Sequence, residues 1–256
     1  MILLSLQWIA QVSNGCDIWA VVPAAGIGRR MQSDIPKQYL NILGRPVIEH
    51  TINRLLRLGR VKGAVIPLQD NDPYWPDIRI ESDKPVIVAP GGEERCHSVM
   101  NALDMLATQP DFRRDNTWAL VHDAVRPCVS TDDIRQLIDL AAGTDSGGLL
   151  AVPVRDTMKR QDDDQRVAHT VDRTGLWHAL TPQLFAWGEL HDALSSALAT
   201  GYLVTDESSA MEHAGHRPLL VQGSAGNIKI TRPADLLLAE LYIKTMSATT
   251  DAGKCL

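Results

Sequence analysis

The sequence predicts an α/β protein in which a mostly parallel β-sheet is flanked by helices. Short apolar runs alternate along the chain with segments of helical periodicity. A glycine-rich turn with clustered cations follows the first apolar run, as at a strand-to-helix turn that binds an anion. The chain has 256 residues, 45% of them hydrophobic, and can therefore bury a sizeable core. We expect a single domain over residues 16–246, with a loosely ordered extension at 1–15 and a tail at 247–256.

Seven apolar runs predict the strands. Short runs of this kind are typical of buried strands in such a sheet. The predicted strands are Ile18–Val22, Ala64–Leu68, Pro85–Ala89, Trp118–Val121, Gly148–Val154, Leu219–Gln222 and Ile228–Thr231.

Six segments predict the helices. In the first, Val47–Leu58, five apolar residues share one face, the ordinary pattern of a core-facing helix. Thr131 and Thr205, each followed by two acids, are typical N-terminal caps, and Pro233 suits the first turn of the last helix. The predicted helices are Val47–Leu58, Glu94–Ala107, Asp132–Ala142, Gly188–Leu198, Glu207–Ala214 and Ala234–Lys244.

One segment, residues 155–175, breaks the alternation. Two polar, β-capable arms flank an acidic turn at Asp162–Asp164, which predicts a protruding hairpin. Such an arm is either a solvated decoration or a contact with a second subunit, because an isolated two-stranded hairpin is barely stable in water.

The composition excludes several classes of protein. A net charge of −6 argues against a nucleic-acid coat, and 5% aromatic residues argue against base-stacking surfaces. The four cysteines form no C-x-x-C pair and have no histidine at zinc-finger spacing, which favours reduced thiols and no zinc site. The apolar start, Met1–Ala10, lacks a basic region and is too short to span a bilayer. We therefore expect a cytoplasmic protein without a nucleic-acid or membrane partner.

The glycine-rich turn suits a polyphosphate. It contains Ala24, Ala25, Gly26 and Gly28, and glycines let backbone N–H groups approach phosphate oxygens closely. A Walker loop is absent, and a dinucleotide fingerprint fails at Met31, where a small residue is needed. The cations that would neutralise a polyphosphate follow at once: Arg29, Arg30 and Lys37.

Two further motifs follow predicted strands. The backbone at Gly92 and Glu93 could line a base pocket together with Ser98, although a glycine turn before a helix with N-terminal acids has the same pattern. Asp123 and Arg126 lie at the carboxyl end of a strand, where open α/β sheets bind ligands. Asp123 could hold Mg²⁺ or a hydroxyl group and Arg126 a phosphate; the alternative is a surface ion pair.

Three other polar residues have open or structural interpretations. His97 is expected on a helix surface, and His122 is expected to be a packed strand residue. Lys229, between two isoleucines, is either a solubilising residue on an edge strand or an inward cation that awaits an anion.

In order, these motifs resemble a known family. The chain contains P-A-A-G-I-G-R-R-M, P-K-Q-Y, G-G-E-E-R, H-D-A-V-R-P, V-R-D-T-M-K, H-T-V-D-R, L-T-P-Q, T-D-E-S-S-A and N-I-K-I-T-R-P. From about Ile18 to Tyr242 it is similar to the 2-C-methyl-D-erythritol 4-phosphate cytidylyltransferases of non-mevalonate isoprenoid synthesis. The resemblance implies a nucleotidyltransferase-type, Rossmann-like domain that dimerises through the hairpin arm. It also implies attack of a polyol phosphate on the α-phosphorus of CTP, with Mg²⁺ and release of pyrophosphate.

The resemblance also implies a role for each site residue. The triphosphate clamp would be Arg30 and Lys37, and the substrate phosphate would be positioned by Lys229 and Arg173. From the arm, Thr157 and Arg173 would reach the partner's site. The floor of the substrate pocket would be Asp123, Arg126 and Thr181, with Asp123 a candidate metal ligand. Cytosine, ribose and phosphates would be bound by Ala24, Ala25, Gly26, Gly28, Gly92, Glu93 and Ser98.

Two departures from the family pattern are visible. Gly226 stands where some relatives carry an acid, and Val125 replaces an alanine. Two other functions compete with the main one. The first is a cytidylyltransferase for another polyol phosphate, such as ribitol 5-phosphate. The second is a non-catalytic nucleotide-binding subunit, against which the intact cations argue.

Overall fold

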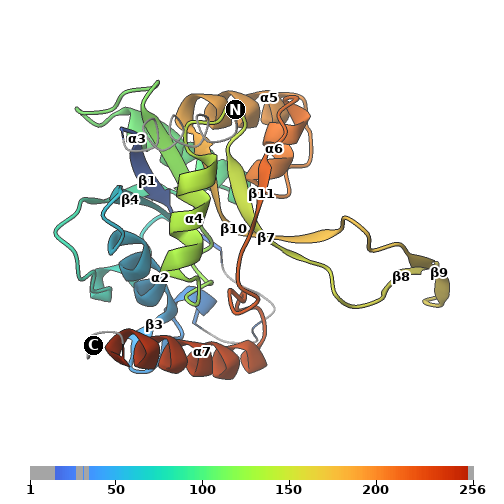
Figure 1. The fold of residues 1–256 in the computed structure, drawn as a ribbon. Coiled ribbons are helices and arrows are strands. Elements are labelled where there is room, and N and C mark those ends of the chain that lie inside the picture. Colours follow the sequence, from blue (N-terminus) through green and yellow to red (C-terminus); the bar gives the residue numbers. More distant parts are fainter. Residues whose placement is uncertain (1–14, 27–30, 32–34, 253–256) are drawn as a thin grey trace.

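A seven-stranded sheet forms the centre of the molecule (Figure 1). The structure is a computed structural model that describes residues 15–26, 31 and 35–252. The strand order is β11-β7-β10-β6-β1-β4-β5. All neighbouring strands are parallel except that β10 is antiparallel to both β6 and β7. The strands are β1 (Asp17–Val21), β4 (Val61–Leu68), β5 (Val86–Pro90), β6 (Thr117–Val121), β7 (Gly148–Pro153), β10 (Trp177–Ala186) and β11 (Leu219–Gln222).

Helices cover both faces of this sheet. One face packs against α2 (Val47–Leu56) and α4 (Thr131–Ala141), and the other against α3 (Arg95–Ala107), α5 (Trp187–Ala199) and α6 (Glu207–His213). Strand β1 serves both layers because its side chains alternate: Ile18 packs in the first layer and Val21 in the second. The fold class predicted from the sequence is confirmed.

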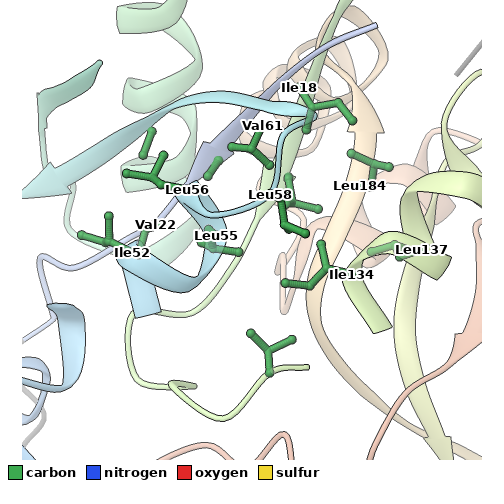
Figure 2. Packing of buried hydrophobic residues seen from close by; sticks show 14 of the residues in the cluster. Ile18, Val22, Ile52, Leu55, Leu56, Leu58, Val61, Ile134, Leu137 and Leu184 are labelled. Atoms are coloured by element: carbon green, nitrogen blue, oxygen red, sulfur yellow. The ribbon is translucent and has the colours of Figure 1, made fainter. Parts of the chain in front are cut away.

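The first layer holds the larger apolar cluster, shown in Figure 2. Ile52 and Leu55 of α2 and Ile134 and Leu137 of α4 belong to this cluster, and all four are fully buried. The apolar face of α2 therefore packs in the core, as predicted.

A third cluster attaches the last helix, α7 (Pro233–Ala252), to the edge of the domain. Ala239 and Ile243 of α7 pack on Val47, Val125 and Ile230. Ile42 joins this cluster from a short hairpin of β2 (Asn41–Ile42) and β3 (Arg45–Pro46), and Leu40 packs on it directly after the 3₁₀ turn η2 (Lys37–Tyr39). A second 3₁₀ turn, η3 (Trp75–Asp77), packs against the first layer instead. Packing in the third cluster holds residues 228–230 beside the loop that follows β6.

A two-stranded hairpin projects from the side of the domain (Figure 1). It pairs β8 (Met158–Gln161) with β9 (Val167–Val171) in antiparallel register. Its strand residues are exposed except for Val171, which is half-buried.

Several predictions about elements are wrong. Residues 228–231 form no strand, because among the described residues their backbone is bonded to another segment only from Ile230 N–H to the Val125 carbonyl oxygen, at 2.9 Å. The central strand β10 is absent from the prediction. The N-caps of α4 and α6 are Ser130 and Asp206, one residue away from the predicted threonines, and both side chains accept backbone N–H groups.

The remaining boundaries differ from the predicted ones by three residues or fewer, except that α7 continues to Ala252. In the part of the chain that the structure describes, none of the helices has the length and apolar character needed to cross a bilayer.

Candidate active site

A cavity of about 500 Å³ opens where parallel strands of the sheet end. Its walls come from the segments that follow β1, β4 and β6 and from the beginning of α3. This is the edge at which open α/β sheets bind ligands. The lining residues are Pro23, Ala24, Ala25, Gly26, Lys37, Gln38, Gln69, Gly92, Glu93, Glu94, Arg95, Ser98, Asp123, Ala124, Val125 and Lys229.

The loop after β1 is fixed by main-chain and side-chain hydrogen bonds. Ala24 N–H donates to the Pro67 carbonyl oxygen at 3.0 Å. The buried Gln38 amide donates to the carbonyl oxygens of Ala24, at 2.7 Å, and Gly26, at 3.2 Å. Because η2 holds Gln38, it also brings its neighbour Lys37 to the cavity. The predicted residues Gly28 and Arg30 lie outside the described residues.

A second wall is the turn before α3. Gly91 N–H donates to the Leu68 carbonyl oxygen at 2.6 Å, and a Cβ atom at Gly91 would lie 2.5 Å from that of Ala25. Only glycine allows this close approach of the two loops. Gly92 N–H donates to Ser98 Oγ at 3.0 Å, so the predicted base-pocket residues do form one wall.

Asp123 lies at the centre of a cluster of three cations. Its Oδ1 accepts from Arg95 Nε at 3.0 Å. Its Oδ2 accepts from Arg126 Nε at 3.2 Å and lies 3.0 Å from Lys229 Nζ. Asp123 and Arg126 are both buried, so they are not the surface ion pair that was the alternative. Lys229 is the inward cation.

The charges in this cluster support one another. Burial alone would raise the pKa of the Asp123 carboxyl, but Arg95, Lys229 and Arg126 hold that pKa well below its usual range. Burial would lower the pKa of Arg95, yet Glu207 and Asp123 raise it above its ordinary value. Arg95 reaches the fully buried Glu207 through two hydrogen bonds, of 2.6 and 3.0 Å. Three cations thus share two carboxylates, which leaves an excess positive charge for an anionic ligand.

His122 is linked to the backbone of Asp123 through the hydroxyl group of Thr181. Asp123 N–H donates to Thr181 Oγ1 at 3.1 Å, and Thr181 Oγ1 lies 3.0 Å from His122 Nδ1. The threonine hydroxyl therefore donates to Nδ1, and Nε2–H of His122 donates to the Arg126 carbonyl oxygen at 3.1 Å. Burial lowers the pKa of His122 to about 4, so the ring is neutral in this arrangement. The ring is packed, as predicted, although it lies just after β6.

A smaller cavity of about 210 Å³ lies on the other side of the cation cluster. It shares Arg95, Asp123 and Lys229 with the larger cavity. Its lining residues are Arg95, Asp123, Arg126, Ala179, Leu180, Thr181, Gln183, Thr205, Asp206 and Lys229. The cation cluster therefore lies where the two cavities adjoin.

The structure brings most of the predicted residues to these cavities, but not the two on the arm. Thr157 and Arg173 are exposed on the segments that lead to and from the hairpin and line neither cavity. Arg173 donates to the carbonyl oxygen of Arg155 within the same arm.

Three residues with contacts at the site were missed from the sequence. Arg95 lies in the G-G-E-E-R motif and Gln38 in P-K-Q-Y. Both motifs contributed to the family resemblance, but neither residue was assigned a role. Glu207 looked like an ordinary acid in a first helical turn. Its pairing with Arg95, 112 positions earlier in the chain, carries no local signal.

Comparisons with known proteins identify a family. A family model described as "IspD: 2-C-methyl-D-erythritol 4-phosphate cytidylyltransferase" matches residues 18–245. A protein of that name from Vibrio vulnificus (strain YJ016) is 52% identical over 224 residues, which cover 88% of this chain and 93% of the relative. One from Escherichia coli O7:K1 is 49% identical over 228 residues, 89% of this chain and 94% of the relative.

Two solved structures superimpose on most of this chain. The crystal structure of a 4-diphosphocytidyl-2C-methyl-D-erythritol synthase superimposes with a TM-score of 0.77 at 35% identity, covering 89% of this chain and 99% of the other. The cytidylyltransferase from Francisella tularensis gives a TM-score of 0.75 at 34% identity, with 88% and 99% covered.

Proposed function

The chain belongs to the 2-C-methyl-D-erythritol 4-phosphate cytidylyltransferase family, and from this premise we propose how its two cavities divide the substrates. The protein is a nucleotidyltransferase. CTP occupies the larger cavity, and the polyol phosphate occupies the smaller one. The observation that carries this proposal is that Arg95, Asp123 and Lys229 line both cavities, so the two ligands meet at a cluster of positive charge.

The reaction at this boundary is a direct displacement. A phosphate oxygen of methylerythritol phosphate attacks the α-phosphorus of CTP, and a new oxygen–phosphorus bond forms. The bond from the α-phosphorus to the bridging oxygen of pyrophosphate breaks, and the leaving group keeps the electron pair. The step needs alignment and charge stabilisation more than a nucleophilic side chain.

The cations of the site have separate roles in stabilising the charges of this reaction. Lys37 and Arg30 neutralise the triphosphate, and Lys229 is placed to contact the oxygens that gain charge at the α-phosphorus. Lys229 is available to both ligands because it lines both cavities. The buried Arg126 and Thr181 form the floor of the smaller cavity. At the larger cavity the nucleoside is bound by Ala24, Ala25, Gly26, Gly28, Gly92, Glu93 and Ser98.

Enzymes of this type generally depend on a metal ion, and we propose Mg²⁺. The donor set of this chain does not fit an ion held by Asp123, because three cations already surround that carboxylate and would repel a fourth. The other carboxylates of the larger cavity, Glu93 and Glu94, are exposed at the start of α3. Mg²⁺ therefore enters as the CTP complex with phosphate oxygens as its ligands, and Asp123 organises the cations instead of binding the ion.

The arm completes the site of a second subunit. We infer a homodimer in which Thr157 and Arg173 of one chain reach the smaller cavity of its partner. Support comes from their exposure in the single chain and from the low stability expected of an isolated hairpin. The family resemblance of the arm motifs points the same way. The cytoplasmic location, the absence of a nucleic-acid partner and the domain boundaries at 16–246 stay predictions.

The identity of the alcohol phosphate is tested by pyrophosphate release. The purified protein is assayed with CTP and each of methylerythritol phosphate, ribitol 5-phosphate and other polyol phosphates, and then with each other nucleoside triphosphate. We expect turnover with CTP and methylerythritol phosphate and little with the other pairs. Faster turnover with another polyol phosphate would contradict the proposed substrate, and no turnover with any pair would favour a non-catalytic binding subunit.

A further inference from the structure

Three potential metal ligands meet at the beginning of α3, beside the larger cavity. A carboxylate oxygen of Glu94, Sγ of Cys96 and a ring nitrogen of His97 lie within 4.8 Å of one another. The spacing of the cysteines predicted no zinc site, because common zinc motifs combine a cysteine with a second cysteine or with a distant histidine. The structure brings a carboxylate, a thiol and an imidazole together from four consecutive positions.

Within the part of the chain that the structure describes, the three ligand groups make only weak contacts. Glu94 is the N-cap residue of α3, yet its exposed side chain makes no capping hydrogen bond. The buried Cys96 is a free thiol whose Sγ lies 3.9 Å from Glu94 Oε2. His97 is half-buried, and its Nδ1 is buried without a hydrogen-bond partner among the described residues. Buried polar atoms normally have a partner, so this imidazole has an unused donor or acceptor.

The residue between the ligands does not neutralise them. Arg95 directs its guanidinium to Asp123 and Glu207, on the side of the cation cluster. The nearby acids Glu93 and Glu94 add negative charge at the start of the helix. These two carboxylates oppose the positive partial charge of the helix N-terminus and favour a small cation beside them.

We propose that Glu94, Cys96 and His97 form a zinc site. Thiolate, imidazole and carboxylate are the side-chain groups that bind Zn²⁺, and three of them leave a fourth position of the tetrahedron for water. Mg²⁺ prefers oxygen ligands, so this site does not compete for the ion that enters with CTP. Nothing in this assignment depends on the proposed substrate.

The site adjoins the wall of the larger cavity. A Cβ atom at Gly92 would lie only 2.3 Å from Cβ of His97, so the loop backbone rests directly on the imidazole residue. Gly92 N–H also donates to Ser98 Oγ, and Glu94 itself lines the cavity. A zinc ion bound here restrains the turn that forms this wall.

The test uses Co²⁺ as a spectroscopic probe, with the metal-free, nucleotide-free full chain. Co²⁺ bound to a thiolate shows sulfur-to-metal charge-transfer absorption, which an ion bound only by oxygens does not show. We expect this band in the unmodified protein, one Co²⁺ per chain, and its loss when Zn²⁺ is added. Cys96→Ser should abolish the band, and His97→Gln and Glu94→Gln should weaken Co²⁺ binding about tenfold or more. The matched controls Cys16→Ser and Cys128→Ser should keep it.

The absence of the band from the unmodified protein would overturn the proposal. Its persistence in Cys96→Ser would do the same, and so would its loss in Cys16→Ser. Circular dichroism of each metal-free variant checks the fold. If Cys96→Ser fails to fold, the result rests on Glu94→Gln, whose side chain is exposed, and on His97→Gln; unchanged Co²⁺ affinity in both would then reject the site.

Discussion

Lys229 Nζ lies 3.0 Å from Asp123 Oδ2, at the boundary shared by the two cavities. The two residues come from segments about a hundred positions apart, and they meet because residues 228–230 lie against the loop after β6. The lysine keeps 39% of its side chain accessible, whereas the aspartate keeps 8%. The buried carboxylate therefore holds an ammonium group that can still contact a ligand.

Replacing Lys37 by alanine should nearly abolish turnover and leave the fold intact. A single cation that stabilises the transition state contributes on the order of 3 kcal/mol, which is about a hundredfold in rate. The measurement is kcat for pyrophosphate release, with thermal unfolding as the check on folding. Lys62→Ala, at an exposed lysine near the amino end of β4, is the matched control. If Lys37→Ala keeps more than half of the activity, the assignment of the triphosphate clamp is wrong.

Replacing Asp123 by asparagine should destabilise the protein strongly. The change leaves Arg95, Arg126 and Lys229 close together without their shared anion, and the loss of one partner of a buried ion pair costs about 3–5 kcal/mol. The free energy of unfolding is measured in urea. Asp17→Asn removes a carboxylate that pairs with exposed cations and should cost about 1 kcal/mol or less. Equal losses in the two variants would contradict the central role of Asp123.

Burial of His122 should make stability depend on pH in a specific window. Its pKa falls from 6.5 to about 4 on folding, so between these values the unfolded chain binds a proton that the folded chain excludes. Stability should therefore decrease as the pH falls from 6.5 to 4, by up to about 3 kcal/mol from this residue alone.

The control for this effect is His122→Gln, in which the carboxylates titrate as before but the imidazole is missing. The free energy of unfolding of both proteins is measured across the same range of pH. The loss should be smaller in the variant; parallel curves would show that His122 is not held neutral.

Removal of divalent metal should stop the reaction reversibly. The four charges of the triphosphate remain poorly neutralised without an ion, so EDTA should abolish pyrophosphate release and added Mg²⁺ should restore it. The variant Asp123→Asn, where it folds, should need no more Mg²⁺ than the unmodified protein, because the ion is held by phosphate oxygens. Full activity in EDTA would rule out the proposed Mg²⁺·CTP substrate.

Much of the fold was predictable because each element carried its own local pattern. The apolar face of α2 and the cap-like sequence before α4 identified these helices within one or two residues of their ends. The loops at the carboxyl ends of the strands followed from the parallel sheet itself. Two of these loops contain Gly92 and Asp123, which line the larger cavity together with Ser98 of α3, as the sequence suggested.

The strand β10 was not predictable in the same way. It contains Pro182, which normally argues against a central strand. The structure accommodates this proline where the pairing with β7 is interrupted, between Ala179 and Gln183. Lys229 illustrates the opposite case: the predicted strand is wrong, but packing of α7 still directs the residue inward. Long-range partners such as Arg95 and Glu207 leave no local signal, so only the three-dimensional structure shows them.

Mixed dimers show whether one active site combines the cavities of one chain with the arm of another. Lys37→Ala and Arg173→Ala subunits should each be inactive alone. After equal amounts exchange freely, half of the dimers should be mixed, and each mixed dimer should hold one site with both residues intact. Activity should then return to about a quarter of the unmodified level per site. If the mixture stays inactive after demonstrated exchange, the arm does not complete the partner's site.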